Sequence, residues 1–210
     1  MIRVLLADDH PVVRTGFKLL LQMHPDVSVV AEAETGEQAC LRYSELAPDV
    51  VIMDLAMPGM GGLEALKRIR ARDPRARVLA LSAHDDPMHA RRALREGALG
   101  FLSKRSAPEA LLNALASVAS GHRYIDADVA QKLALAEIDG SSSPVDKLSE
   151  REFEIFLRLA AGGTVQGIAE DLHLSASTVG THLYNVKQKL AAENQSELTL
   201  IAIRHGLIQP

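Results

Sequence analysis

Five residues that could together handle a phosphoryl group are spread over the first half of the chain: Asp8, Asp9, Asp54, Ser82 and Lys104. Three carboxylates brought together repel one another, and oxygen-only ligands favour Mg²⁺, with Mn²⁺ as the alternative. A divalent ion held there would make Asp54 a usable nucleophile toward phosphorus, with Ser82 and Lys104 contacting the phosphoryl oxygens. These residue types together indicate a site that forms an aspartyl phosphate.

A structural explanation exists for some of these residues taken singly. Asp8 or Asp9 could cap the helix expected to begin near Pro11, and Ser82 or Lys104 alone would indicate little. The joint pattern is more informative, because each of the five residues ends or follows a short apolar run. We therefore favour one shared site over five separate structural roles.

The elements that must position this site alternate along residues 1–120. Short β-branched or Leu-rich runs predict buried strands over 3–7, 27–33, 50–53, 77–81 and 100–102. Helical periodicity lies between and after them, over 12–21, 37–46, 63–72, 89–96 and 109–120. Strands alternating with helices predict an α/β domain with a parallel sheet covered on both faces.

In such open sheets, ligands bind outside the carboxyl ends of the strands, where the strand order reverses. If the order is 2-1-3-4-5, the reversal lies between the first and third strands. Asp8 and Asp9 follow the first strand and Asp54 follows the third, so their carboxylates converge at the reversal. Ser82 and Lys104 end the fourth and fifth strands and lie beside them.

The chain changes character after residue 120. Residues 121–147 contain one short amphipathic helix at 128–137, and then a run of Gly, Ser and Pro that is typical of a linker. From residue 148 to 210 the periodicity is helical only, with helices expected over 150–161, 165–172, 176–190 and 196–205. We predict a first domain over 1–120, a linker over 121–147 and a small all-α domain of four helices over 148–210.

Composition narrows the class of protein. A net charge of −4 with 47% hydrophobic residues among 210 is typical of a globular protein and excludes a disordered or strongly basic chain. No apolar run approaches the roughly 18 residues of a membrane span, so we expect a cytoplasmic protein without a membrane partner. The single cysteine, Cys40, cannot form an internal disulfide, and no Cys/His spacing suggests zinc.

The segment SASTVGTHLYNVKQKL, residues 175–190, has the pattern of a helix that reads DNA. Ser175 is a natural N-cap, and an apolar stripe recurs at helical spacing through Val179, Leu183, Val186 and Leu190. The remaining positions supply the candidate DNA-binding residues Ser177, Thr178, Gly180, Thr181, Tyr184, Asn185, Lys187 and Gln188. The preceding helix ends two residues before Ser175, near His173, so the pair is predicted to be a helix-turn-helix.

Charge limits how tightly this domain can bind DNA. Residues 147–210 hold six Lys and Arg against seven Asp and Glu, which gives −1. Because DNA affinity depends on phosphate neutralisation, one copy should bind weakly. No acid lies between residues 173 and 192, so positive charge is local, and a dimer would double the contacts.

The first domain resembles the receiver domain of bacterial two-component response regulators. The resemblance is carried by LLADDH, DVVIMDLAMPGMGG, ALSA and GALGFLSK. It implies a flavodoxin-like fold and phosphorylation of Asp54 by a sensor histidine kinase. It also implies Mg²⁺ held by Asp8, Asp9, Asp54 and the backbone carbonyl of Ala56. The implied switch residues are Ser82 and Phe101, and Ala56 and His84 would lie near the path of hydrolytic water.

The second domain resembles the LuxR-type domain of NarL/FixJ regulators over about 148–208. LSEREFEI, GIAEDLHLSASTVGTHLYNVKQKL and ELTLIAIRHGL carry this resemblance, and with GHRYI they are closest in pattern to the GacA/UvrY branch. The resemblance implies that the third helix enters the major groove of double-stranded DNA and that the fourth helps a phosphorylated homodimer to form. Gly167 and Gly180 depart from the pattern, which usually has a polar residue at these places.

These observations predict a DNA-binding transcriptional regulator, activated by phosphorylation of Asp54, that is not an enzyme and has no catalytic residue. Two other functions stay open at this point. A metal-dependent phosphohydrolase could use Asp54 as its nucleophile, although Ala56 stands where a general acid would be expected. Alternatively, the helical domain could bind proteins instead of DNA.

Overall fold

The structure is a computed structural model that describes residues 1–83, 87–106, 108–138, 144–172, 174–205 and 207–208. The chain divides into two compact units, Met1–Asp139 and Gly140–Pro210, each with its own core. Among the described residues, no helix combines the length and the apolar character needed to cross a membrane.

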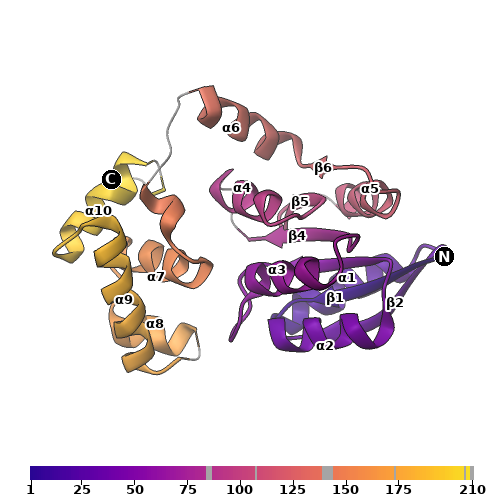
Figure 1. Cartoon of the computed structure of the whole chain (residues 1–210), viewed down its shortest axis with the longest axis horizontal. Coiled ribbons are helices and arrows are strands. Elements are labelled where there is room, and N and C mark those ends of the chain that lie inside the picture. Colours follow the sequence, from indigo (N-terminus) through magenta and orange to yellow (C-terminus); the bar gives the residue numbers. More distant parts are fainter. Residues whose placement is uncertain (84–86, 107, 139–143, 173, 206, 209–210) are drawn as a thin grey trace. The chain divides into compact units, whose positions relative to one another are not determined.

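The first unit is built on a parallel sheet. Its strands in the described chain are β1 (Ile2–Ala7), β2 (Val27–Ala33), β3 (Val50–Asp54), β4 (Val78–Ser82), β5 (Gly100–Ser103) and β6 (Tyr124–Ile125). Their order is β2-β1-β3-β4-β5-β6, and each neighbouring pair is parallel (Figure 1). The predicted order 2-1-3-4-5 is confirmed, and β6 extends the sheet beyond β5. The reversal of strand order lies at β1 and β3.

Helices cover both faces of this sheet. They are α1 (Pro11–Gln22), α2 (Gly36–Leu46), α3 (Gly62–Arg72), α4 (Pro87–Arg95) and α5 (Pro108–Ala119). Because neighbouring residues of a strand point to opposite faces, β1 and β3 supply one core through Leu5 and Val51 and the other through Val4 and Ile52. Strands buried on both faces account for the continuous apolar runs in the sequence.

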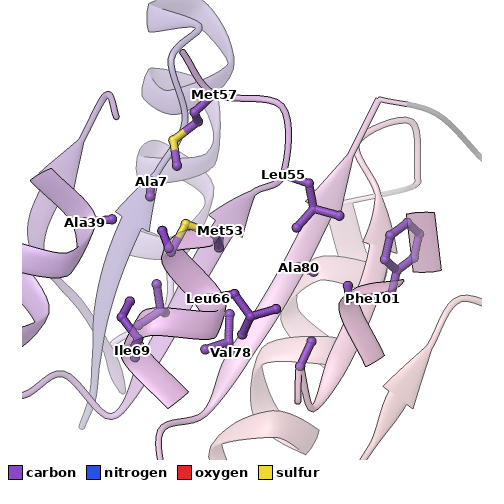
Figure 2. Close-up of a cluster of buried hydrophobic side chains, with 14 of the residues drawn as sticks. Ala7, Ala39, Met53, Leu55, Met57, Leu66, Ile69, Val78, Ala80 and Phe101 are labelled. Atoms are coloured by element: carbon purple, nitrogen blue, oxygen red, sulfur yellow. The ribbon is translucent and has the colours of Figure 1, made fainter. Parts of the chain in front are cut away.

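The first of these cores contains the methionine of β3 and the phenylalanine of β5. Figure 2 shows Met53 and Val78 of the strands beside Leu66 and Ile69 of α3, with Phe101 of β5 in the same cluster. All five are fully or almost fully buried. This packing fixes β3 and β5 relative to each other below the ends that carry the charged residues.

Part of the predicted linker continues the first unit. Strand β6 pairs with β5, and helix α6 (Ala127–Ile138) packs against α4 (Figure 1). Val129 of α6 is buried in the same cluster as Phe101. Asp126, between β6 and α6, donates its N–H to the carbonyl of Phe101 at 3.2 Å and accepts a hydrogen bond from Ser106 Oγ at 2.5 Å. Residues 139–143, also predicted as linker, lie outside the described residues.

The second unit consists of helices. It contains the 3₁₀ turn η1 (Pro144–Lys147), α7 (Glu150–Ala160), α8 (Val165–Asp171), α9 (Ala176–Leu190) and α10 (Gln195–Arg204). Each of the four α-helices is preceded by a capping residue whose side chain accepts a backbone N–H of the first turn. These caps are Ser149, Thr164, Ser175 and Asn194. Helix α7 packs against α8, α9 and α10. The four predicted helices are therefore present, with ends shifted by one residue at most.

Candidate functional site

Charged residues meet at the carboxyl edge of the sheet in the first unit. Asp8 follows β1, Asp54 is the last residue of β3, and Lys104 follows β5. The Nζ atom of Lys104 lies 2.7 Å from Asp8 Oδ2 and 2.7 Å from Asp54 Oδ2. Both carboxylates are buried. The parallel strands thus deliver three residues far apart in the sequence to one ion-paired group.

Asp9 and His10 complete the acidic side of this group. Asp9 is 27% exposed, and its Oδ1 lies 2.8 Å from His10 Nδ1. The backbone N–H of His10 donates to Asp8 Oδ1 at 2.8 Å. Helix α1 has His10 at its N-cap position without a side-chain capping bond, so neither carboxylate caps α1 in the way the structural explanation required. The imidazole at this site was missed from the sequence, although the D-D-H run contained it.

The donor set suits a hard divalent cation. Ligand atoms of Asp8, Asp9, His10 and Asp54 all lie within 4.8 Å of one another. Three carboxylates and the Lys104 ammonium leave two negative charges in a largely buried place. Oxygen-rich sites with this surplus of charge bind Mg²⁺ or Mn²⁺. The residues present therefore fit such an ion.

The electrostatic environment affects both partners of the central ion pair. Burial has the largest effect on the pKa of Asp54 and raises it, and the neighbouring charge of Asp8 raises it further. The Lys104 ammonium and the Ala56 N–H lower this pKa, but by less, so the net pKa of Asp54 lies above the usual range. Burial lowers the pKa of Lys104, but Asp54 and Asp8 outweigh burial, so its pKa lies above the ordinary value. Lys104 therefore remains an ammonium at neutral pH and compensates carboxylates that burial would otherwise protonate.

The backbone after Asp54 turns tightly around its carboxylate. The N–H of Ala56 donates to Asp54 Oδ1 at 3.1 Å. A Cβ atom on Gly62 would lie 1.8 Å from the carbonyl oxygen of Asp54, so only glycine can begin α3 at this place. The turn therefore holds the backbone of Ala56, whose carbonyl the resemblance implies as a metal ligand, beside Asp54.

The two candidate switch residues are buried on neighbouring strands. Ser82 is the last residue of β4, and its carbonyl accepts the N–H of Lys104 at 2.7 Å. Phe101 lies inside the core beside β4 and α6 and is fully buried. The hydroxyl of Ser82 is thus at the same edge as Lys104, and Phe101 lies deeper in the sheet. His84 lies outside the described residues.

Arg14 is a further residue of this region that sequence analysis missed. Its Nη1 donates to the backbone carbonyl of Asp8 at 2.7 Å, and its Nε and Nη2 donate to Glu32 and Glu34 of the neighbouring strand region at 3.1 and 2.7 Å. The side chain is 12% exposed. Arg14 therefore ties the segment that carries Asp8 to β2, a role that no periodicity in the sequence indicates.

In the second unit, the predicted DNA face of α9 points to solvent. Ser177, Thr178, Thr181, Tyr184 and Gln188 are exposed, and Gly180, Asn185 and Lys187 are half-buried. Val179, Val186 and Leu190 on the opposite side are buried, and Leu183 packs against the cluster formed with α7 and α8. The aromatic ring of Tyr184 is notable because the residue is 64% exposed.

The hydroxyl groups of this face are oriented by the helix itself. Thr181 Oγ1 donates to the carbonyl of Ser177 at 3.1 Å, and the hydroxyls of Thr178 and Ser175 lie 2.8 Å apart. Within the described chain, no side-chain hydrogen bond engages Tyr184. Tyr184 therefore offers a free phenol, whereas the two threonines retain acceptor positions.

The lysines of α9 are less available than the sequence suggests. Lys187 Nζ donates to the carbonyl of Glu193 at 2.9 Å, and Lys189 Nζ donates to Glu152 Oε2 at 2.6 Å. Arg151 and Arg158 on α7 form ion pairs with Glu154. Positive charge on the exposed side of α9 thus comes mainly from Lys187.

The bond between Lys189 and Glu152 joins α9 to the start of α7 and yields a testable prediction. Burial raises the pKa of Glu152, but Lys189 and the backbone N–H of Ser149 outweigh burial, so its net pKa lies below the ordinary value. Because Lys189 is 39% exposed, we expect Lys189→Met to lower the free energy of unfolding by only about 1–2 kcal/mol at pH 7.

The pH dependence follows from the sign of that pKa shift. A carboxylate with a lowered pKa stabilises the fold above its unfolded-state pKa of about 4.3 and stops doing so as the pH falls through the folded-state pKa. The difference between wild type and Lys189→Met should therefore shrink toward zero below about pH 4. Urea unfolding followed by circular dichroism measures it, with Lys187→Met as control. If Lys189→Met lowered the free energy of unfolding equally at pH 7 and below about pH 4, this account would be contradicted.

Comparison with known families assigns both units. Residues 4–116 match the family model described as response regulator receiver domain. Residues 146–202 match the model described as bacterial regulatory proteins, luxR family. The two matches lie in the first and second compact units, respectively.

Individual relatives match over nearly the whole chain. Response regulator UvrY of Escherichia coli (strain K12) is 42% identical over 209 residues, which are 99% of this chain and 96% of that protein. Response regulator GacA of Pseudomonas protegens is 41% identical, over 99% of this chain and 98% of that protein. The structure of RcsB from Salmonella enterica serovar Typhimurium, bound to promoter rprA in the presence of phosphomimetic BeF3⁻, is 28% identical with a TM-score of 0.64. The match covers 95% of this chain and 97% of the RcsB chain.

Proposed function

Because the chain belongs to the LuxR family of response regulators, which are DNA-binding transcription regulators and not enzymes, we propose that phosphorylation of Asp54 by a sensor histidine kinase switches on its binding to double-stranded DNA. The observation that carries this proposal is the buried contact of Lys104 with both Asp8 and Asp54. That contact supplies a nucleophile and the cation that would compensate its phosphorylated form. Family membership argues against the alternatives of a phosphohydrolase and of a protein-binding helical domain.

The proposed reaction is transfer of a phosphoryl group to a carboxylate. An oxygen of Asp54 attacks phosphorus, the bond from phosphorus to the kinase imidazole breaks, and that imidazole leaves. Asp8, Asp9, Asp54 and the carbonyl of Ala56 would hold Mg²⁺, or Mn²⁺ with the same ligands. When bound, such an ion neutralises the carboxylates and polarises the phosphoryl oxygens. The Ala56 N–H keeps Asp54 oriented at 3.1 Å.

Phosphorylation would then change what Lys104 and Ser82 contact. The Lys104 ammonium, now 2.7 Å from Asp54 Oδ2, would pair with a phosphoryl oxygen, and the Ser82 hydroxyl would donate to another. Movement of Ser82 at the end of β4 changes the space beside Phe101, so both residues serve as the switch. The phosphoryl group favours whichever arrangement of β4 and β5 binds it better, and the population shifts accordingly.

The output is binding of α9 in the major groove. The proposed contacts are Ser177, Thr178, Gly180, Thr181, Tyr184, Asn185, Lys187 and Gln188, of which five are exposed. With a charge of −1 over residues 147–210, one copy binds weakly, so we propose that the phosphorylated protein binds as a homodimer. The promoter-bound RcsB structure, which carries a phosphomimetic, supports this coupling. A regulator that binds DNA in this way acts in the cytoplasm.

Acetyl phosphate and Mg²⁺ are expected to raise the affinity of the chain for a genomic DNA fragment selected by the phosphorylated protein. Asp54→Ala should take up no phosphoryl group and show no gain, because among the described residues no other carboxylate pairs with Lys104 beside Asp8. Intact mass and fluorescence anisotropy measure the two effects, and Asp26→Ala, which removes an exposed carboxylate, is the control. A gain in DNA affinity that persists in Asp54→Ala would refute the proposal.

A further inference from the structure

The turn between β3 and α3 is held from outside by the start of α2. Met60, in this turn, donates its backbone N–H to Oε1 of Glu37 at 2.9 Å. Gly59 and Gly61 of the turn adopt positive φ angles of +72° and +76°. The carboxylate of Glu37 also lies against Gly59, because a Cβ atom there would come within 2.9 and 3.0 Å of the two carboxylate oxygens. Glu37 therefore contacts the turn at two successive residues.

The start of α2, which carries the exposed residue Glu37, is itself held by capping hydrogen bonds. Thr35 caps α2 by accepting the N–H of Gln38, and Gln38 Oε1 in turn accepts the N–H of Glu34 at 3.0 Å. Glu37 lies in the first turn of α2, where the helix dipole favours a carboxylate. Gly36 packs so closely on the β3–α3 turn that a Cβ atom would lie 2.6 Å from the carbonyl oxygen of Gly61. The start of α2 is thus a rigid support for this turn.

The conformation of this turn also affects the position of Ala56. The N–H of Ala56 orients Asp54 at 3.1 Å, and the carbonyl of Ala56 is the proposed metal ligand. At the far end of the turn, the N–H of Gly62 donates to the carbonyl of Leu55 at 3.0 Å. Because glycines at positive φ leave a turn with other accessible conformations, the bond from Met60 to Glu37 adds to this internal bond in favouring the observed one.

We propose that Glu37 is a positioning residue for phosphorylation of Asp54. It does not touch Asp54. By fixing Met60 it keeps the turn in the conformation in which the Ala56 N–H meets Asp54 and the Ala56 carbonyl is presented for the metal. This inference rests on the proposed function of Asp54, and it assigns to α2 a part in a site otherwise built from the ends of the strands.

The test compares Glu37→Ala with Glu37→Gln in the full chain. We expect Glu37→Ala to weaken Mg²⁺ binding about tenfold, the size of effect typical for residues that orient metal ligands. Phosphorylation by acetyl phosphate should need correspondingly more Mg²⁺ and approach the wild-type rate when Mg²⁺ is saturating. Glu37→Gln retains an acceptor oxygen for the Met60 N–H and should restore both properties. Isothermal titration with Mg²⁺ and rates against Mg²⁺ concentration measure them.

Glu45→Ala is the matched control, since Glu45 lies on the same helix and pairs only with Arg42 at the surface in the described structure. It should bind Mg²⁺ as wild type does. A wild-type Mg²⁺ Kd in Glu37→Ala would overturn the role of Glu37, and a Gln variant as weak as the Ala variant would overturn the hydrogen-bond account. Wild-type protein that takes up no phosphoryl group would instead overturn the proposed function itself.

Discussion

Replacing Lys104 by Met is expected to tighten Mg²⁺ binding about tenfold while slowing phosphoryl transfer to Asp54 by about 10²–10³. The two effects have opposite signs for one reason. The Lys104 ammonium lies 2.7 Å from both Asp8 and Asp54, so it competes with a metal ion for the charge of these carboxylates. In the transfer reaction, however, the same ammonium would compensate the charge that the phosphoryl oxygens bring.

The Lys104→Met protein should also depend on the metal for its stability. Without the ammonium, Asp8 and Asp54 are buried together, and the pKa of Asp54, already raised mainly by burial, rises further. We expect urea unfolding to show lower stability in EDTA and recovery in Mg²⁺ by a larger margin than in wild type. Lys67→Met, at an exposed position of α3, is the control. Weaker Mg²⁺ binding in Lys104→Met would contradict the competition described here.

Gly180→Lys is expected to raise the general DNA affinity of the chain several-fold and to steepen its salt dependence by about one counterion. A Cβ atom at Gly180 would meet nothing within 4 Å, so the fold has room for the new side chain. Replacing a helical glycine also favours the helix by up to about 1 kcal/mol. Because Lys187 supplies most of the positive charge on the exposed side of α9, a second cation there should matter.

Fluorescence anisotropy on a non-specific duplex over a range of salt concentrations measures this effect. Gly16→Lys is a matched control, because Gly16 lies in helix α1 of the first unit and a Cβ atom there also meets nothing within 4 Å. Gly180→Ala separates the gain in helix stability from the added charge. If both Gly180 variants bind DNA more weakly while their circular dichroism is unchanged, the backbone at Gly180 must approach the duplex closely.

The sequence predicted the charged group at the sheet edge because the rules that place it are simple. Parallel strands put their carboxyl ends at one edge, so Asp8, Asp54 and Lys104 could be brought together from the strand pattern alone. Helix α9 was predictable for a similar reason, since its apolar spacing fixes which residues face outward. Its bounds in the structure, Ala176–Leu190, are those of the predicted helix 176–190.

Residues that act through individual bonds could not be predicted in this way. Glu37 reaches Met60 across 23 positions, and Lys189 reaches Glu152 across 37. Both contacts depend on rotamers and on how two elements pack, and neither leaves a periodic trace in the sequence. His10 is similar, because its ring joins the acidic group only through the path the chain takes after β1.

Strand β6 could not be predicted from the sequence, for a different reason. Tyr124 and Ile125 are of types that favour strands, but two residues are too few to show an alternation. What places them is the free edge of β5, whose residues Gly100 and Phe101 pair with them. An edge offers backbone hydrogen bonds to any extended segment nearby, whatever its side chains.

This pairing determines where the two halves of the chain could be separated or exchanged with those of another regulator. A fragment cut at residue 120 would lose β6 and α6, leaving unpaired the backbone groups of β5 that face β6 and removing Val129 from its place in the core. Such an exposed edge invites association between copies. A junction after Ile138 keeps β6 paired with β5 and Val129 in the core. In a library of hybrid regulators, soluble products should therefore be more frequent among fusions joined after residue 138 than among those joined at 120.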